Sequence, residues 1–133
     1  MKQLIILKES DDKIQNANNL FDKIKKINVD YTQENVIVFY LNTRNEVINS
    51  EVLFKGGLNS CILDPKTTFR KALINNANSI IIAHNHPSGD LKPSKEDINI
   101  YKDFEKIGDI ISISVLDSII FNKKEYYALK EVV

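Results

Sequence analysis

The stretch SIIIAHNHPSGDLKPSKED, residues 79–97, decides the fold of this protein. Its apolar first half predicts a short buried strand, because a continuous apolar run is typical of a strand covered on both faces. His84 and His86 follow one residue apart, and they are the only histidines in the chain. Proline and glycine then mark a loop, and Ser94 with Asp97 predicts the start of a helix. Both imidazoles therefore stand where a strand ends and a loop leads back to a helix.

Length and composition indicate one globular domain. The chain has 133 residues, of which 43% are hydrophobic and 27% charged, as in an ordinary soluble domain. Eighteen basic and eighteen acidic residues cancel, which argues against nucleic-acid binding through the overall field. The single cysteine, Cys61, excludes an internal disulfide and suits a reducing cytosol. The apolar run near the start is too short for a signal peptide or a membrane span, so we expect a cytoplasmic protein that does not associate with a membrane.

Helical and strand patterns are interleaved along the chain. The predicted strands cover residues 1–10, 35–42, 46–54, 58–63, 79–84, 110–116, 118–121 and 126–130, and the predicted helices begin near residue 11, at Asp64-Pro65 and at Ser94, the last one ending at Gly108. We therefore expect an α/β (α+β) fold with a single domain over residues 1–133. A mixed sheet with about three helices packed on it would form this domain, with residues 1–30 as an N-terminal strand and helix extension and residues 31–133 as the core.

The two histidines can share one metal ion. Residues i and i+2 of a strand point to the same side, so His84 and His86 can aim at one point. Asp97, eleven residues on, is the next candidate ligand, because the loop can bring the helix start back to the strand end. Three protein ligands leave a fourth position for water, which is the arrangement of a catalytic zinc rather than a structural one. One Zn²⁺ ion held there would lower the pKa of the water to roughly 7.

Two simpler roles stay open for these residues. The histidines can hydrogen-bond a loop, and Asp97 can close a capping box with Ser94 as N-cap. Capping and metal binding do not exclude each other. The letters HNH are weak evidence for a nuclease, because that label denotes a constellation dispersed through a different unit.

The spacing His84-x-His86-Pro87, followed by Ser94-x-x-Asp97, resembles the JAMM signature of the JAB/MPN metallo-isopeptidase superfamily. The wider sequence is similar in order and spacing to the RadC family, bacterial proteins named for DNA repair. The likeness covers roughly residues 30–130 and includes FYLNTRNEVINSEVLFKGGLN, DPKTTFRKALINNANSIIIAHNHPSG and ISVLDSIIF. It implies a JAB/MPN (cytidine-deaminase-like) architecture, with His84, His86 and Asp97 as the metal ligands.

The resemblance also implies two catalytic residues. It places the general base at Glu51, in the second strand of the hairpin, and gives the Ser94 hydroxyl a role in holding the oxyanion. Apolar neighbours surround Glu51 in the sequence, and partial burial would raise its pKa toward that of a useful base. The alternative is an edge strand on which Glu51 faces water. Glu46 and Glu34 are poorer candidates, because Glu46 lies at the hairpin turn and Glu34 precedes its strand.

The expected function is zinc-dependent hydrolysis of amide or isopeptide bonds in an unidentified peptide or protein substrate, as in a metalloprotease. The main alternative is a non-catalytic module that docks to protein or DNA. Cleavage of nucleic acid is disfavoured, because the sequence has no basic stripe and no carboxylates for a second metal. A role in DNA repair, and any nucleic-acid partner, is implied by the resemblance alone. We expect the chain to lack the helix-hairpin-helix region of RadC proteins, and Ser118 stands where they usually have histidine.

Overall fold

The computed structural model describes residues 13–56 and 63–130 of the chain. Three helices and five strands alternate along these residues, and none of the helices is long and apolar enough to cross a membrane. In chain order the elements are α1 Ala17–Lys25, β1 Glu34–Leu41, β2 Val47–Gly56, α2 Pro65–Ile74, β3 Ser79–Asn85, α3 Lys95–Ile111, β4 Ser114–Phe121 and β5 Tyr126–Ala128. The strand predicted over 1–10 and most of that over 58–63 fall outside the described residues.

The strands form one mixed sheet in the order β2-β1-β3-β4-β5, which confirms the predicted fold class. β1 and β2 are the predicted antiparallel hairpin, and in its turn the Asn45 N–H donates to the Asn42 carbonyl at 3.0 Å. β1 also pairs antiparallel with β3, whereas β3 and β4 are parallel and β5 returns antiparallel to β4. A parallel pair needs a crossover, and α3 supplies it. The carboxyl ends of β3 and β4 therefore share one edge of the sheet with the start of β1.

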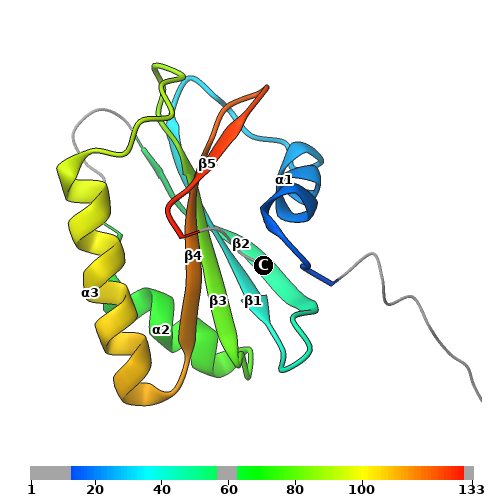
Figure 1. The fold of residues 1–133 in the computed structure, drawn as a ribbon, viewed down its shortest axis with the longest axis vertical. Helices are drawn as coiled ribbons and strands as arrows, with labels where there is room; N and C mark the ends of the chain where they lie inside the picture. The colour runs from blue at the N-terminus through cyan, green and yellow to red at the C-terminus, as the bar shows by residue number, and fades with distance from the viewer. Residues whose placement is uncertain (1–12, 57–62, 131–133) are drawn as a thin grey trace, which may run out of the picture.

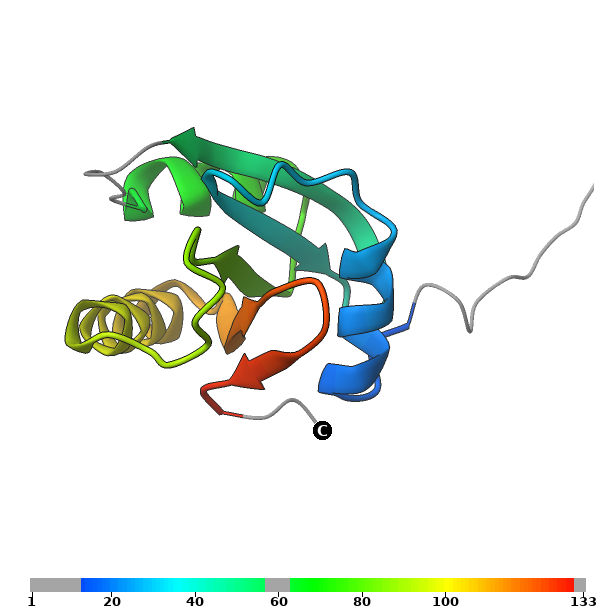
Figure 2. The same ribbon diagram turned by 90° about the horizontal axis from the view of Figure 1, so that it is seen from above.

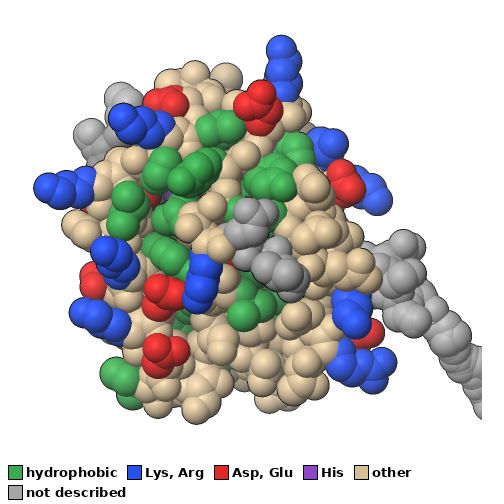
Figure 3. Space-filling view, in the orientation of Figure 1, with side chains coloured by type: hydrophobic (Ala, Val, Ile, Leu, Met, Phe, Trp, Pro, Cys, Tyr) green, Lys and Arg blue, Asp and Glu red, His purple; other side chains and the backbone are tan. Residues whose placement is uncertain are grey.

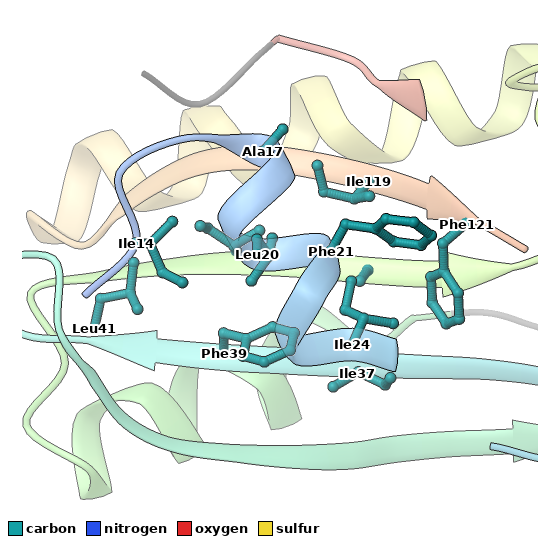
Figure 4. Close-up of a cluster of buried hydrophobic side chains, with 12 residues drawn as sticks. Ile14, Ala17, Leu20, Phe21, Ile24, Ile37, Phe39, Leu41, Ile119 and Phe121 are labelled. Carbon is teal, nitrogen blue, oxygen red and sulfur yellow. The ribbon is translucent and has the colours of Figure 1, made fainter. Parts of the chain in front are cut away.

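Helices cover both faces of the sheet, α1 on one and α2 with α3 on the other (Figures 1 and 2). α1 has only 9 residues, too few for a stable helix alone, so packing must hold it in place. Its buried side chains Leu20, Phe21 and Ile24 lie over Ile37 and Phe39 of β1 (Figure 4). α1 is thus part of the same core as the sheet.

The opposite face carries a second cluster of buried residues beneath α2 and α3. Alternate residues of β1, Val36 and Val38 among them, point to this side, as the two-residue period of a strand requires. The rings of Phe69 in α2 and Phe104 in α3 lie 5.5 Å apart and join the two helices. α2 begins as predicted, with the Asp64 side chain accepting from the Lys66 N–H. This face of the sheet also carries the site described below.

The boundary between α3 and β4 differs from the prediction. α3 runs through Gly108 to Ile111, and Ser112 ends it in the left-handed conformation with φ 63°. A Cβ at position 108 would overlap the carbonyl oxygen of Ile113, so glycine is needed here for close approach of the chain and not to end the helix. The strands predicted over 110–116 and 118–121 are one strand, β4.

Candidate metal centre

His84 is the sixth residue of β3 and shares a face with Ile80 and Ile82. The backbone thus directs its ring to the side covered by α2 and α3. The His84 side chain is 10% exposed, and its Nε2 is buried. Among the described residues this Nε2 makes no hydrogen bond, although Oδ1 of Asp97 lies 3.3 Å away. A buried polar atom without a hydrogen bond needs an explanation, and a bound cation would supply one.

His86 follows the end of β3, and the loop fixes the state of its ring. Its Nδ1 lies 2.7 Å from the carbonyl oxygen of Asp90. A carbonyl oxygen only accepts, so Nδ1 carries the hydrogen and the Nε2 of a neutral ring has a lone pair. This Nε2 lies 3.1 Å from Oδ2 of Asp97, which is also an acceptor. Two facing acceptors repel unless a proton or a cation lies between them. The adjacent Asp97 accordingly raises the pKa of His86, despite partial burial.

Asp97 is the third residue of α3 and closes a capping box. Its Oδ2 accepts from the Ser94 N–H at 2.8 Å, while its own N–H donates to Ser94 Oγ at 2.9 Å. These bonds satisfy two backbone groups at the helix start and fix the Asp97 rotamer. Burial alone would raise the pKa of Asp97, but the adjacent His84 and His86 rings and the Ser94 N–H hold it well below its usual range. Asp97 is therefore an anion held between two imidazoles.

The structure brings His84, His86 and Asp97 together as a group that can hold a metal ion. One ligand atom from each lies within 4.8 Å of the other two. The Nε2 atoms of His84 and His86 are 3.3 and 3.1 Å from the two carboxylate oxygens of Asp97. Ligands bound at 2.0–2.1 Å to a tetrahedral ion lie roughly 3.3 Å from one another. The buried His84 Nε2, the His86 Nε2 lone pair and the carboxylate spacing thus fit a cation, and the His86 Nδ1 bond to a carbonyl is typical of metal-bound histidine.

Glu34 also belongs to this site, although the sequence made it a poor candidate. It opens β1 instead of preceding it. The register pairs Val36 with His84, and its continuation by two residues sets Glu34, on the same face as Val36, level with His86. Burial raises the pKa of Glu34, and the charges of His84 and His86 oppose that rise while Asp97 supports it. These interactions place Glu34 within electrostatic range of all three candidate ligands.

Glu51 lies on the same face of the sheet but farther from the group. It is opposite Val38, on β2, and β1 separates β2 from β3. Neighbouring strands are about 4.8 Å apart, so Glu51 stands roughly 10 Å across the sheet from β3. Its carboxylate accepts from Tyr40 Oη at 2.9 Å and pairs with Lys71 Nζ at 3.4 Å. Because Tyr40 is opposite Ile80, these contacts draw the Glu51 side chain away from His84.

A pair of asparagines joins the two strands that carry the site. Asn85 is fully buried between the histidines, and its Oδ1 accepts from the Asn35 N–H at 2.8 Å. Its Nδ2 donates to the Gln33 carbonyl at 2.9 Å. Asn85 thus fixes the end of β3 against the start of β1, and with it the position of Glu34. The sequence offered only a polar residue between two histidines as a signal of this role.

Fold and site together define a small α/β domain with a candidate metal centre at a sheet edge. The chain belongs to the RadC-like JAB domain family, which it matches over residues 14–132. It is 42% identical to a UPF0758 protein of Staphylococcus haemolyticus over 86% of this chain and 49% of that protein. A UPF0758 protein of Clostridium botulinum is 43% identical, over 92% of this chain and 54% of that protein. The chain thus spans about half the length of these curated relatives, whose names state no activity.

Proposed function

We propose that this domain is a zinc-dependent hydrolase of amide or isopeptide bonds. The observation that carries the proposal is the meeting of two histidine Nε2 atoms with the Asp97 carboxylate, one of the nitrogens buried without a hydrogen bond. Two imidazoles with one carboxylate favour zinc over calcium and magnesium, which prefer all-oxygen ligand sets. His84, His86 and Asp97 would hold the ion, and three protein ligands are the number found at catalytic zinc.

Bound zinc would supply Lewis-acid polarisation of the carbonyl and acidification of a water molecule. The remaining chemistry falls to the side chains around it. A carboxylate must take the proton of the attacking water and return it to the leaving amine. Glu34 fits this role better than Glu51, because it lies level with His86 and partial burial raises its pKa. The Glu51 oxygens are instead occupied by Tyr40 and Lys71.

Ser94 would stabilise the oxyanion that forms when the carbonyl is attacked. Its Oγ accepts from the Asp97 N–H, so the hydroxyl proton points elsewhere and can donate to an oxyanion. The exposed position of Ser94 at the start of α3 leaves it accessible to a substrate carbonyl. The helix N-terminus adds a favourable dipole for developing negative charge.

Metal content and two glutamate variants test the proposal. Purified protein should contain one zinc per chain, and His86→Ala should lose it. Glu34→Gln should keep zinc but lower hydrolysis at least about 100-fold, whereas the matched control Glu51→Gln should keep most of the activity. Hydrolysis is measured in a cell extract, after addition of zinc-loaded protein, as new free amines, which are amino termini for peptide bonds and lysine ε-amines for isopeptide bonds. Equal numbers of new amines with wild type and Glu34→Gln would refute this assignment of the base, and no new amines of either kind with wild type would favour a docking module.

A further inference from the structure

A groove leads away from the candidate metal centre. A cavity of about 270 Å³ opens beside His86, between its loop (Pro87 and Gly89) and a wall formed by Tyr31 and residues 122–124. A second hollow of about 520 Å³ extends from Tyr31 and Lys123 to Lys25 at the end of α1. Both hollows share Tyr31 and Lys123, so they form one groove, here called the lysine groove. The segments that border it lie at the upper end of the molecule in Figure 1 and face the viewer in Figure 2.

Asn122 fixes the groove to the loop that carries His86. Its Nδ2 donates to the Gly89 carbonyl at 2.9 Å. Its Oδ1 accepts from the N–H groups of Lys124 and Glu125, both at 2.8 Å, which holds the turn between β4 and β5 in shape. The backbone of Lys123 and Lys124 therefore stands at a set position relative to His86.

The charges along the groove favour an anion. Lys123 Nζ lies 5.6 Å from the centre of the Tyr31 ring, where the two hollows meet. Lys124 lines the hollow beside His86, and Lys25, which pairs with Asp22 Oδ1 at 3.6 Å, lines the far one. Asp30 is the single acidic residue among the described residues that line either hollow. Its carboxylate already accepts hydrogen bonds from the neighbouring residues 32 and 33.

We infer that the lysine groove binds the substrate chain beside the scissile bond and prefers an acidic side chain next to Lys123 and Lys124. The inference rests on the proposed hydrolase function, because it makes His86 the reacting end of the groove. The hollow beside His86 is smaller than the roughly 300–1,000 Å³ of a pocket for a drug-sized ligand, so it suits one or two side chains. The zero formal charge and the interspersed acidic and basic groups in Figure 3 favour a peptide over a nucleic acid.

Peptide binding without turnover tests the inference. The zinc-loaded Glu34→Gln protein is titrated against fluorescein-labelled, amidated octapeptides of glycine and serine with two adjacent central residues, either Glu-Glu or Gln-Gln. We expect the Glu-Glu peptide to bind about tenfold more tightly at low salt, with the preference lost at high salt. Combined Lys123→Glu and Lys124→Glu changes should reverse it. The matched control Lys106→Glu, an exposed lysine of α3 that lines neither hollow, should leave it intact.

Two further probes test whether the groove binds another kind of anion instead of an acidic side chain. A Gln-Gln peptide with a free terminal carboxylate and a fluorescein-labelled decathymidylate are titrated in parallel. Equal affinity for the Glu-Glu and Gln-Gln amidated peptides overturns the inference. Tighter binding of either parallel probe than of the Glu-Glu peptide, lost on Lys123→Glu, overturns it as well. The binding experiment needs no hydrolysis, so it is independent of the hydrolase proposal. Selective binding of acidic peptides by a protein that cleaves nothing would refute the hydrolase proposal alone. Cleavage without a preference for acidic peptides would refute the inference about the groove alone.

Discussion

Replacement of Asp97 by asparagine should separate its role in helix capping from its proposed role as a metal ligand. The asparagine oxygen can take the place of Asp97 Oδ2 and still accept from the Ser94 N–H, and its amide group then takes the place of Oδ1, where it can donate to His84 Nε2. We therefore expect Asp97→Asn without metal to be within about 1 kcal/mol of wild type in free energy of unfolding, the main loss being a carboxylate at a helix start.

Zinc should reveal the difference. At free zinc a hundred times the dissociation constant, wild type should gain about 2.7 kcal/mol, roughly 10 °C in Tm. A variant that binds zinc a hundredfold more weakly gains only about 0.4 kcal/mol under the same conditions. The assay is thermal unfolding in EDTA and in buffered zinc, with zinc per chain measured by mass spectrometry.

Ser94→Ala is the matched control for this experiment. It removes the hydroxyl that accepts from the Asp97 N–H but leaves the carboxylate. Loss of an N-cap costs about 1 kcal/mol, and this loss should be the same with and without zinc. An Asp97→Asn protein that keeps the full 2.7 kcal/mol gain would show that Asp97 is only a helix cap.

Two further predictions concern stability. Asn85→Ala leaves the buried Asn35 N–H without its acceptor and removes one of the two side-chain bonds to the Gln33 carbonyl, so unfolding by urea should show a loss of about 3 kcal/mol, whereas alanine at the exposed Asn99 should change it little. The Asp64 carboxylate accepts from Thr67 Oγ1, which lowers its pKa below the ordinary 3.8. Its contribution is thus fully present above the unfolded pKa and lost as the pH falls through the folded one, so the destabilisation by Asp64→Ala should be largest at pH 7 and shrink as the pH is lowered toward 2. A constant difference between the two unfolding curves over this pH range would contradict that assignment.

The sequence predicted what local patterns encode. The apolar run of residues 80–83, the Asp64-Pro65 start of α2 and the Ser94 cap of α3 are all as expected. The histidine spacing predicted that both rings and Asp97 could meet, because a strand period and a loop length suffice for that inference. The predicted end of α3 was wrong. Gly108 looks like a helix stop in the sequence, and only the close approach of the Ile113 carbonyl oxygen shows why this residue is glycine.

The identity of the acid nearest to the candidate metal centre depends on strand pairing, which no local pattern encodes. The sequence favoured Glu51 over Glu34, which it set before its strand, because a local pattern could not rank the two by their distance from the histidines. The pairing of β1 between β2 and β3 does so, because it puts Glu34 level with His86 and Glu51 across an intervening strand. The buried bonds of Asn85 to Asn35 and Gln33 hold that pairing at the edge where the chemistry would occur. The position of the proposed base is therefore a property of sheet register, and a change in this asparagine pair should affect activity even though neither residue would contact substrate.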